Sequence, residues 1–421
     1  MKRRTRKSDT ACPPGWSLEA VEAGLSKTTE VFAHELARPS TSAPDWSEPE
    51  WLLARATASI HGVSSLLSGN LRWRGPEGWA RFLAEQRAHT LIRHTRICDL
   101  LAAIDARMRT AGVSTIALKG AALHAIGLYA AGERPMADTD LLVQPPDLER
   151  AIQILEGLGF HQTYATWKDR TFEPSDAFTP GRLGENSDNP IKIELHDRVG
   201  DILPLRPIDI SECLFASDPL PGVNLYPSTA SLMLHLLLHA AGAMASRSLR
   251  LINLHDIAVL CTRMTANDWQ DIMRLAEVAG GPWWVFPPLA LTARYYTSLI
   301  PPWTLAAFAP DCPRPLRKAV CRQTLSDLSF SHLWIGAFPG IRWARSFREA
   351  LEYVAQRIVP GAEALRTRKQ FVNTQPYLAE SEWGHLSQAM RILRWLRSRP
   401  PRPGTMRVVR EALKQQPEQS T

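Results

Sequence analysis

The stretch "ERPMADTDLLV", residues 133–143, decides how the fold of this chain is interpreted. Asp138 and Asp140 stand one residue apart in it, directly before the apolar run 141–143, and Arg134 precedes them. Like charges on one strand face repel and Asp is a poor strand former, so a strand that begins with two acids needs a specific reason for them. Because alternate side chains of a strand point the same way, we expect both carboxylates on one face, about 7 Å apart.

The segments around this strand predict a compact α/β or α+β unit. Residues 114–120, "STIALKG", begin as a short β-rich stretch and end in glycine, and residues 121–132 have a helical period. Residues 145–160 predict a helix behind the strand 138–143. In "IKIELH", residues 191–196, apolar and polar side chains alternate, which indicates a half-buried strand with one polar face.

Helical periodicity dominates the rest of the chain and suggests five regions. The predicted class is α+β, with a small mixed β-sheet between N-terminal helices and a mostly α-helical C-terminal region. The expected regions are a disordered basic arm (1–15), an N-terminal helical region (16–112), the mixed core (113–227), a C-terminal helical region (228–400) and a basic tail (401–421). We expect that tail to be solvated rather than bound to a membrane surface.

Composition places the chain among globular proteins. Of its 421 residues, 45% are hydrophobic and 22% charged. The six cysteines form no CxxC pair, which favours reduced thiols. No apolar segment follows the basic start, and the apolar stretches 231–245 and 282–303 are too short or too interrupted to span a bilayer. These features predict a cytoplasmic protein with no transmembrane segment.

Positive charge is concentrated at the two ends of the chain. The net charge is +7, but residues 1–7 carry five bases and residues 391–421 a net +6, which leaves −4 for the body. Proteins that grip long nucleic acid build a basic surface into the folded body. Long nucleic acid is therefore an unlikely partner.

A third acid, Glu194, lies on the polar face of the second predicted strand. If the two strands are neighbours, three carboxylates converge with Asp138 and Asp140, and at least one takes up a proton unless a cation neutralises them. Mg²⁺, or Mn²⁺, prefers such oxygens and binds substrate phosphates with them. Asp197 lies close enough to be an alternative third acid.

Basic residues near these acids favour a phosphate ligand. Lys119 and Gly120 follow the first strand and open a helix, whose N-terminal N–H groups suit phosphate. Arg134 and Lys192 are close to the acids in sequence. We expect these four residues to bind a nucleotide.

The run from "LKG" (118–120) through "DTDLLV" (138–143) to "IELHDR" (193–198) resembles the uncharacterised bacterial nucleotidyltransferases of the DNA-polymerase-β-like superfamily. The resemblance covers about residues 100–280. It implies a small mixed sheet, a divalent metal held by Asp138 and Asp140, and Glu194 as metal ligand or activator of the acceptor. The superfamily usually has Gly-Ser before the paired acids, whereas this chain has Lys119–Gly120–Ala121, as does the group it most resembles.

The resemblance implies metal-dependent transfer of a nucleoside monophosphate from an NTP to an acceptor hydroxyl, with release of pyrophosphate. One alternative is a catalytically silent module that binds a nucleotide or a partner. The acceptor stays open among a small molecule, a peptide, a protein and a tRNA end. The nucleotide and the oligomeric state are also open.

Histidines in the helical region suggest a second alternative. His235 and His239 are four residues apart, and His255 precedes Asp256, a pattern that would suit a His/Asp metal phosphohydrolase. Packing near the domain interface is the more common role of such histidines. His196, His235, His239 and Asp256 could otherwise shape the acceptor pocket. We expect His196 to share the face of Glu194 only if the strand is bulged.

Overall fold

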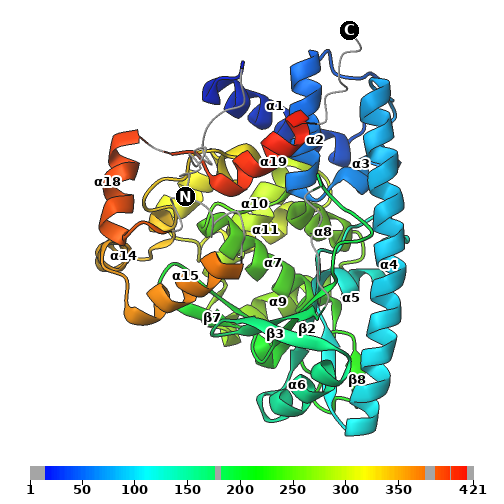
Figure 1. The fold of residues 1–421 in the computed structure, drawn as a ribbon. Coiled ribbons are helices and arrows are strands. Elements are labelled where there is room, and N and C mark those ends of the chain that lie inside the picture. The colour runs from blue at the N-terminus through cyan, green and yellow to red at the C-terminus, as the bar shows by residue number, and fades with distance from the viewer. Residues whose placement is uncertain (1–14, 176–181, 375–384, 399, 415–421) are drawn as a thin grey trace, which may run out of the picture.

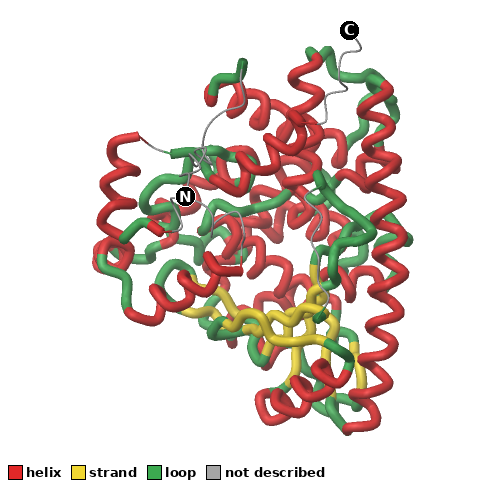
Figure 2. The backbone as a smooth tube through the Cα atoms, viewed as in Figure 1, coloured by secondary structure: helices red, strands yellow, loops and turns green. Residues whose placement is uncertain are grey.

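The computed structural model describes residues 15–175, 182–374, 385–398 and 400–414. It is an α+β protein in which one mixed sheet lies at one end of a large helical assembly (Figures 1 and 2). Both the predicted fold class and the small mixed sheet are confirmed. The predicted basic arm lies outside the described residues except for its last position.

Six strands form the main sheet in the order β3-β4-β5-β2-β1-β8. Their bounds are β1 Ser114–Ala117, β2 Asp138–Val143, β3 Phe160–Ala165, β4 Asp169–Pro174, β5 Lys192–His196 and β8 Gly222–Asn224. β2 pairs antiparallel with β1 and parallel with β5. β6 (Gly200–Ile202) and β7 (Pro207–Asp209) form a separate hairpin. The two strands predicted to carry the acids are therefore neighbours.

The two faces of β2 and β5 have opposite characters. Leu141, Val143, Ile193 and Leu195 are fully buried on one face, in a core shared with α4 (Glu77–Ala111) and α6 (Leu148–Gly157). Residues of the opposite polar face lie toward α7 (Thr229–Ala245) and α8 (Leu251–Cys261). The period-two alternation of strand side chains thus separates an apolar face from a polar one.

Four N-terminal helices cover one side of the molecule. They are α1 (Leu18–Ala37), α2 (Glu48–His61), α3 (Ser64–Asn70) and α4. α4 runs along the whole right edge of Figure 1 and ends at Gly112, whose φ of 66° is a conformation that glycine adopts without strain. α4 therefore links the helical end of the molecule to the sheet.

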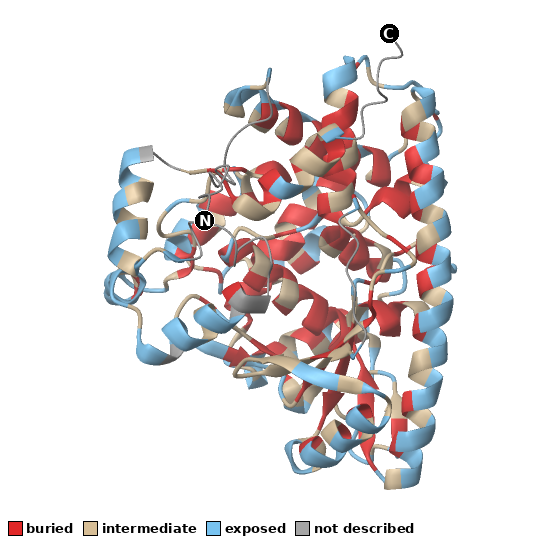
Figure 3. Ribbon diagram, viewed as in Figure 1, coloured by how far each residue is buried: buried red, intermediate tan, exposed pale blue. Residues whose placement is uncertain are grey.

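The C-terminal helices complete the assembly. After α7 and α8 come α9 (Ala266–Val278), α10 (Phe286–Tyr295), α11 (Pro302–Phe308), α12 (Arg314–Val320), α13 (Leu325–Leu328), α14 (Phe347–Ile358), α15 (Ala362–Thr374), α18 (Gln388–Ser398) and α19 (Pro403–Lys414). In Figure 3 the central helices are largely buried, whereas α14, α15 and α18 are mostly exposed. Among the described residues, no helix is both long and apolar enough to cross a membrane.

The last described helix differs from the expectation of a solvated tail. α19 packs against α2, and Met406, Val409 and Ala412 are fully buried. Its apolar residues recur three apart and so form one stripe, which explains why a helix that looks basic in sequence still docks on the core. The expectation of a solvated tail is wrong for residues 403–414.

Several predicted element boundaries also differ. The helix expected at 121–132 is α5 (Lys119–Ala125), which begins at Lys119 with a positive φ of 47° and ends seven residues earlier than expected. The sequence patterns did not reveal β3 and β4, whose side chains are mostly only half-buried and therefore show no clear alternation. These two strands extend the sheet beyond β5.

Candidate active site

The paired acids lie where the sequence placed them, at the start of β2. Asp138 stands opposite Lys192 and Asp140 opposite Glu194 across the parallel pair β2 and β5. Asp138, Asp140 and Glu194 all line a cavity of about 410 Å³ between the sheet and the helices α7 and α8. The fold therefore gathers three carboxylates from two strands around one space.

β5 also brings His196 to the same face. The pairing of β5 with β2 is unbroken from Asp138 to Leu142, so no bulge is needed, and the condition attached to His196 was wrong. His196 Nε2 donates to Asp140 Oδ1 at 3.1 Å and lies 3.8 Å from Glu194 Oε2. Asp197 points elsewhere, pairing with Arg170 at 3.6 Å and lining none of this cavity.

Crowding of buried acids shifts their protonation. Burial, followed by the charges of Asp138 and Asp140, raises the pKa of Glu194 to about 9. Burial and the charge of Asp140 likewise raise the pKa of Asp138. Asp140 differs: burial opposes its ionisation, but the charge of Lys119 and the hydrogen bond from His196 outweigh it, so its pKa lies well below the usual range. The site holds more negative charge than its own cations neutralise.

Lys119 is the cation placed directly among the acids. Its side-chain Nζ lies 2.8 Å from Asp140 Oδ1, and its backbone N–H donates to the hydroxyl of Tyr226 at 3.3 Å. Burial opposes its charge, but Asp140, Glu194 and Asp138 together raise the pKa of Lys119. A non-glycine residue at positive φ costs about 1 to 3 kcal/mol, and such strain is often found at functional sites.

Arg134 also lines the cavity, but Asp256 of α8 holds its guanidinium. Nε and Nη2 of Arg134 donate to Asp256 at 2.8 and 2.6 Å, and Tyr129 donates to the same carboxylate at 2.9 Å. Gly120 makes this arrangement possible, because a Cβ there would lie 2.2 Å from Arg134 Nη1. Arg134 therefore ties the loop before β2 to α8.

The predicted nucleotide ligand Lys192 lies away from the cavity. Its ammonium pairs with Glu173 of β4, and the residue does not line the 410 Å³ space. Lys192 is half-buried near the strand entrance. Its position is that of a cation that links β5 to β4 within the sheet.

The histidines of α7 and α8 are packed rather than clustered. His235 accepts from Tyr226 at 2.6 Å, and His255 contacts the Tyr296 hydroxyl at 2.9 Å. Burial lowers the pKa of His255 to about 4 and holds those of His235 and His239 well below their usual value, so all three are neutral. His196, His235 and His239 border a neighbouring space of about 20 Å³, and His239 also lines the large cavity.

Three residues of the site were missed in the sequence. Arg250, the N-cap of α8, lines the cavity, and its charge opposes the effect of burial and of Asp140 on the pKa of Asp138. Arg93 of α4 donates to the carbonyl oxygens of Met136 and Ala137 at 3.1 and 3.2 Å. No local motif marks these residues, because only the tertiary fold brings them to the acids.

The third missed residue is Glu185. It lines the cavity and pairs with Arg93 Nε at 3.0 Å. Arg93 is buried and so fixes both the entrance of β2 and the loop that carries Glu185. This loop is rich in Pro, Gly and Asn, a composition that indicates a loop and does not mark a site residue.

The acids of this site fit a divalent cation. Within the described parts of the chain, Asp140, Glu194 and His196 form the single group of three or more His, Cys, Asp or Glu side chains whose ligand atoms lie within 4.8 Å of one another. Asp138 faces the same cavity but stands outside this group. Mg²⁺ and Mn²⁺ prefer carboxylate oxygens as ligands, and this site has more carboxylates than nearby cations to neutralise them.

Comparison with known proteins gives one match. A model of the family described as an uncharacterised nucleotidyltransferase matches residues 47–297, which is more than half of the chain. No curated protein and no solved structure matches the sequence significantly. The matched segment contains the acids of β2 and β5 and the N-terminus of α8. The chain therefore belongs to the uncharacterised nucleotidyltransferase family.

Proposed function

We propose that the protein is a metal-dependent enzyme that transfers a nucleoside monophosphate from an NTP to an acceptor hydroxyl and releases pyrophosphate. One observation carries this proposal: the pairing of β2 with β5 puts Asp138, Asp140 and Glu194 on the same face of the two strands, where they line a 410 Å³ cavity. Carboxylates so placed would hold Mg²⁺ or Mn²⁺. A bound divalent cation would neutralise the acids and stabilise the charge of the reacting phosphates.

Arg250 is the residue best placed to receive the triphosphate. Three basic residues line the cavity: Lys119 is paired with Asp140, Arg134 with Asp256, and Arg250 has no ion pair among the residues described. A planar guanidinium binds phosphate oxygens in a bidentate manner. Ser248 and Asn253 line the cavity beside Arg250 and offer further polar groups. This end of α8 would supply the contacts that the missing serine supplies elsewhere in the superfamily.

Glu194 is the candidate base for the acceptor hydroxyl. With a pKa near 9, its carboxyl holds a proton at neutral pH while the acids are unneutralised. An added positive charge beside it lowers that pKa and frees the carboxylate to accept a proton. Glu194 is thus expected to act only in the metal-loaded site.

The two alternatives differ in the residues they need. A His/Asp phosphohydrolase would need His235, His239, His255 and Asp256 as one ligand group, but Asp256 is bound by Arg134 and Tyr129, and His235 and His255 bond to tyrosine hydroxyls. Within the described residues, none of these four belongs to a group of converging metal-ligand atoms. A silent binding module would use the same cavity without turnover. The specific support for catalysis is the converging third acid, Glu194, which simple nucleotide binding does not require.

Calorimetric titration of ATP, GTP, CTP and UTP, with Mg²⁺ and with chelator, tests the proposal. We expect metal-dependent binding that the double variant Asp138→Asn/Asp140→Asn loses. Glu173→Gln is the matched control, because it removes a carboxylate of the same sheet that does not line the cavity.

Two outcomes would contradict the proposal. Equal binding by the double variant would place the nucleotide elsewhere. Metal-dependent binding that is unchanged in Glu194→Gln, with no pyrophosphate release by either protein across an acceptor panel, would favour the silent module.

A further inference from the structure

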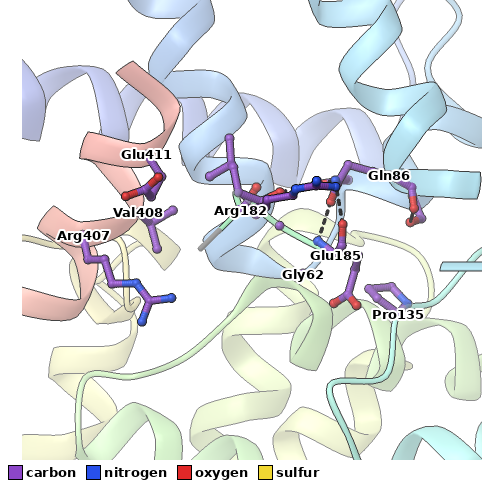
Figure 4. Close-up of a pocket in the computed structure, with 13 residues that line it drawn as sticks. Gly62, Gln86, Pro135, Arg182, Glu185, Arg407, Val408 and Glu411 are labelled. Carbon is purple, nitrogen blue, oxygen red and sulfur yellow. Dashed lines mark hydrogen bonds between the residues drawn. The ribbon is translucent and has the colours of Figure 1, made fainter. Parts of the chain in front are cut away.

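A second cavity opens beside the acid-lined one, and we call it the side chamber. It has a volume of about 200 Å³ and lies between α2, α4, the loop at residues 182–185 and α19 (Figure 4). Figure 4 shows Arg182, Gln86 and Val408 projecting from three of these segments toward the same space. Segments far apart in the sequence therefore build one compact space.

The side chamber adjoins the acid-lined cavity. Gly62, Pro135 and Glu185 line both spaces. Pro135 lies three residues before Asp138, so the junction is close to the reacting centre. A ligand whose phosphates lie at the acids can therefore extend past this junction into the side chamber.

The walls of the side chamber suit a neutral polar ring. Its charged residues balance, with Arg182 and Arg407 against Glu185 and Glu411. Serine hydroxyls at 59, 64 and 65 add donors and acceptors without charge. Balanced polar walls recognise a neutral heterocycle through its edges, whereas a second anionic group would need an excess of cations.

Glu185 stands at the junction in a fixed position. Arg93 Nε lies 3.0 Å from its carboxylate, and Gln86 holds its backbone, with Oε1 accepting from the Glu185 N–H at 2.7 Å and Nε2 donating to its carbonyl at 3.1 Å. Gly184 next to it has a φ of 74° and leaves no space for a Cβ, which would lie 2.2 Å from Gln86 Oε1. A fixed carboxylate between two spaces is placed to accept hydrogen bonds from sugar hydroxyls.

α19 contributes the outer wall of the side chamber. Arg407, Val408 and Glu411 line it, and α19 lies outside the residues 47–297 that match the family. Its docking on α2 is fixed by buried Met406 and Val409. α19 thus adds a wall from outside the matched segment to a cavity that adjoins the acid-lined one.

We propose that the side chamber binds the nucleobase of the NTP and that Glu185 binds the ribose hydroxyls, with the triphosphate at Arg250 and the acids. This inference rests on the proposed function. The arrangement of the two adjoining cavities supports it: the acids and Arg250 line the first, the Glu185 carboxylate lies where the two meet, and balanced polar walls line the second.

The test compares ligands with and without a nucleoside. ATP, GTP, CTP, UTP and inorganic tripolyphosphate are titrated with Mg²⁺ into the wild type, Val408→Trp and Ala88→Trp. Val408→Trp puts an indole into the side chamber from α19, and Ala88→Trp puts one on an exposed position of α4 that lines neither cavity.

We expect the wild type to bind at least one NTP more tightly than tripolyphosphate. Val408→Trp should weaken the binding of that NTP by about tenfold or more, since tenfold corresponds to one lost contact of ordinary strength. The affinity for tripolyphosphate should not change. Ala88→Trp should change neither affinity.

Other results separate the two levels of the proposal. If tripolyphosphate binds but no NTP binds better, or if Val408→Trp leaves NTP affinity unchanged, the nucleobase assignment is overturned while the phosphate site stands. A Val408→Trp protein that binds the NTP normally but loses pyrophosphate release would make the chamber an acceptor site. If neither NTP nor tripolyphosphate binds the wild type, the proposed function fails and this inference fails with it.

The ribose contact has its own test. We expect the wild type to bind the ribonucleotide more tightly than its 2′-deoxy form, and Glu185→Gln to reduce the ratio of these two affinities. An undiminished preference in Glu185→Gln would overturn the assignment of Glu185 to the ribose.

Discussion

The two faces of the strand pair β2 and β5 make opposite contributions to the protein. On one face Leu141, Val143, Ile193 and Leu195 are fully buried and stabilise the fold through the removal of apolar surface from water. On the other face Asp138, Asp140 and Glu194 crowd together, and two of them have raised pKa values. The apolar face stabilises the sheet, whereas the acids of the polar face repel one another and lower the stability of the fold.

The contrast between the two faces indicates that the polar face of β2 and β5 serves function. Selection for stability alone would not place three acids beside one another on a half-buried strand face. The fold can tolerate this loss of stability because the opposite face packs closely against α4 and α6. Variants on the two faces should therefore separate stability from activity.

The largest expected effect is on activity, at the polar face. Asp138→Asn should reduce nucleotidyl transfer about a thousandfold or more, because it removes a carboxylate that would hold the metal. Its free energy of unfolding in chelator should not fall, because the change relieves repulsion with Asp140. Steady-state pyrophosphate release and urea unfolding measure the two effects. A variant that loses stability and activity in parallel would contradict the separation of the faces.

Leu195→Ala tests the apolar face. The substitution leaves a cavity in the core beside α4 and should lower the free energy of unfolding by about 2 to 5 kcal/mol. Metal-dependent nucleotide affinity of the folded protein should stay within about threefold, because the side chain points away from the acids. Urea unfolding and calorimetry at low temperature check both values, and a larger loss of affinity would show that the faces are coupled.

His61 tests how the helical assembly behind the cavity responds to pH. Its Nδ1 accepts from the Leu251 N–H at 2.9 Å, and burial, with the charge of Arg250, lowers its pKa to about 3. The unfolded chain binds this proton near pH 6.5, so the stability that neutral His61 contributes is present above pH 6.5 and is lost as pH falls toward 3. Between pH 7 and pH 5 the loss from this residue should be about 2 kcal/mol.

The measurement is urea unfolding at both pH values for the wild type and His61→Gln. The variant should lose less stability on acidification than the wild type does. His34→Gln is the control, because this histidine is on an exposed position of α1. An equal loss in all three proteins would contradict the assignment.

The smallest effects distinguish two cations. Arg250→Ala should weaken Mg²⁺–NTP binding by about tenfold to a hundredfold, since Arg250 faces the acids without an ion pair among the described residues. Lys192→Ala should change affinity by less than about twofold, and stability by less than about 1 kcal/mol, because Lys192 is paired with Glu173 outside the cavity. Calorimetry on the two variants ranks them, and the reverse order would restore Lys192 as a phosphate ligand.

Sequence reasoning located the strand acids and the fold class because their signals are local. The period of two puts Asp138 and Asp140 on one face, and alternation in residues 191–196 marks Glu194 as polar-facing. It also placed Lys119 among the candidate residues near the acids. The positive φ of Lys119 and its pairing with Asp140 are not marked by any sequence pattern. Local patterns thus specified the strands that carry the acids.

The contacts between distant segments could not be read from the sequence. Arg134 was expected at a phosphate, but its guanidinium lies on Asp256, 122 residues away. Arg250 and Glu185 reach the cavity only through the packing of α8 and of the loop at 182–185. α19 was expected to be solvated, since its basic composition hides an apolar stripe that the surface of α2 covers. Such pairings follow from tertiary packing rather than from spacing.

The most direct test of the central claim is a crystal structure of the protein with Mn²⁺ and α,β-methylene ATP. The account predicts an anomalous Mn²⁺ peak at about 2 Å from carboxylate oxygens of Asp138, Asp140 and Glu194, with the triphosphate against Arg250. Nucleotide bound at another surface, or bound in this cavity with no Mn²⁺ at the acids, would contradict the account.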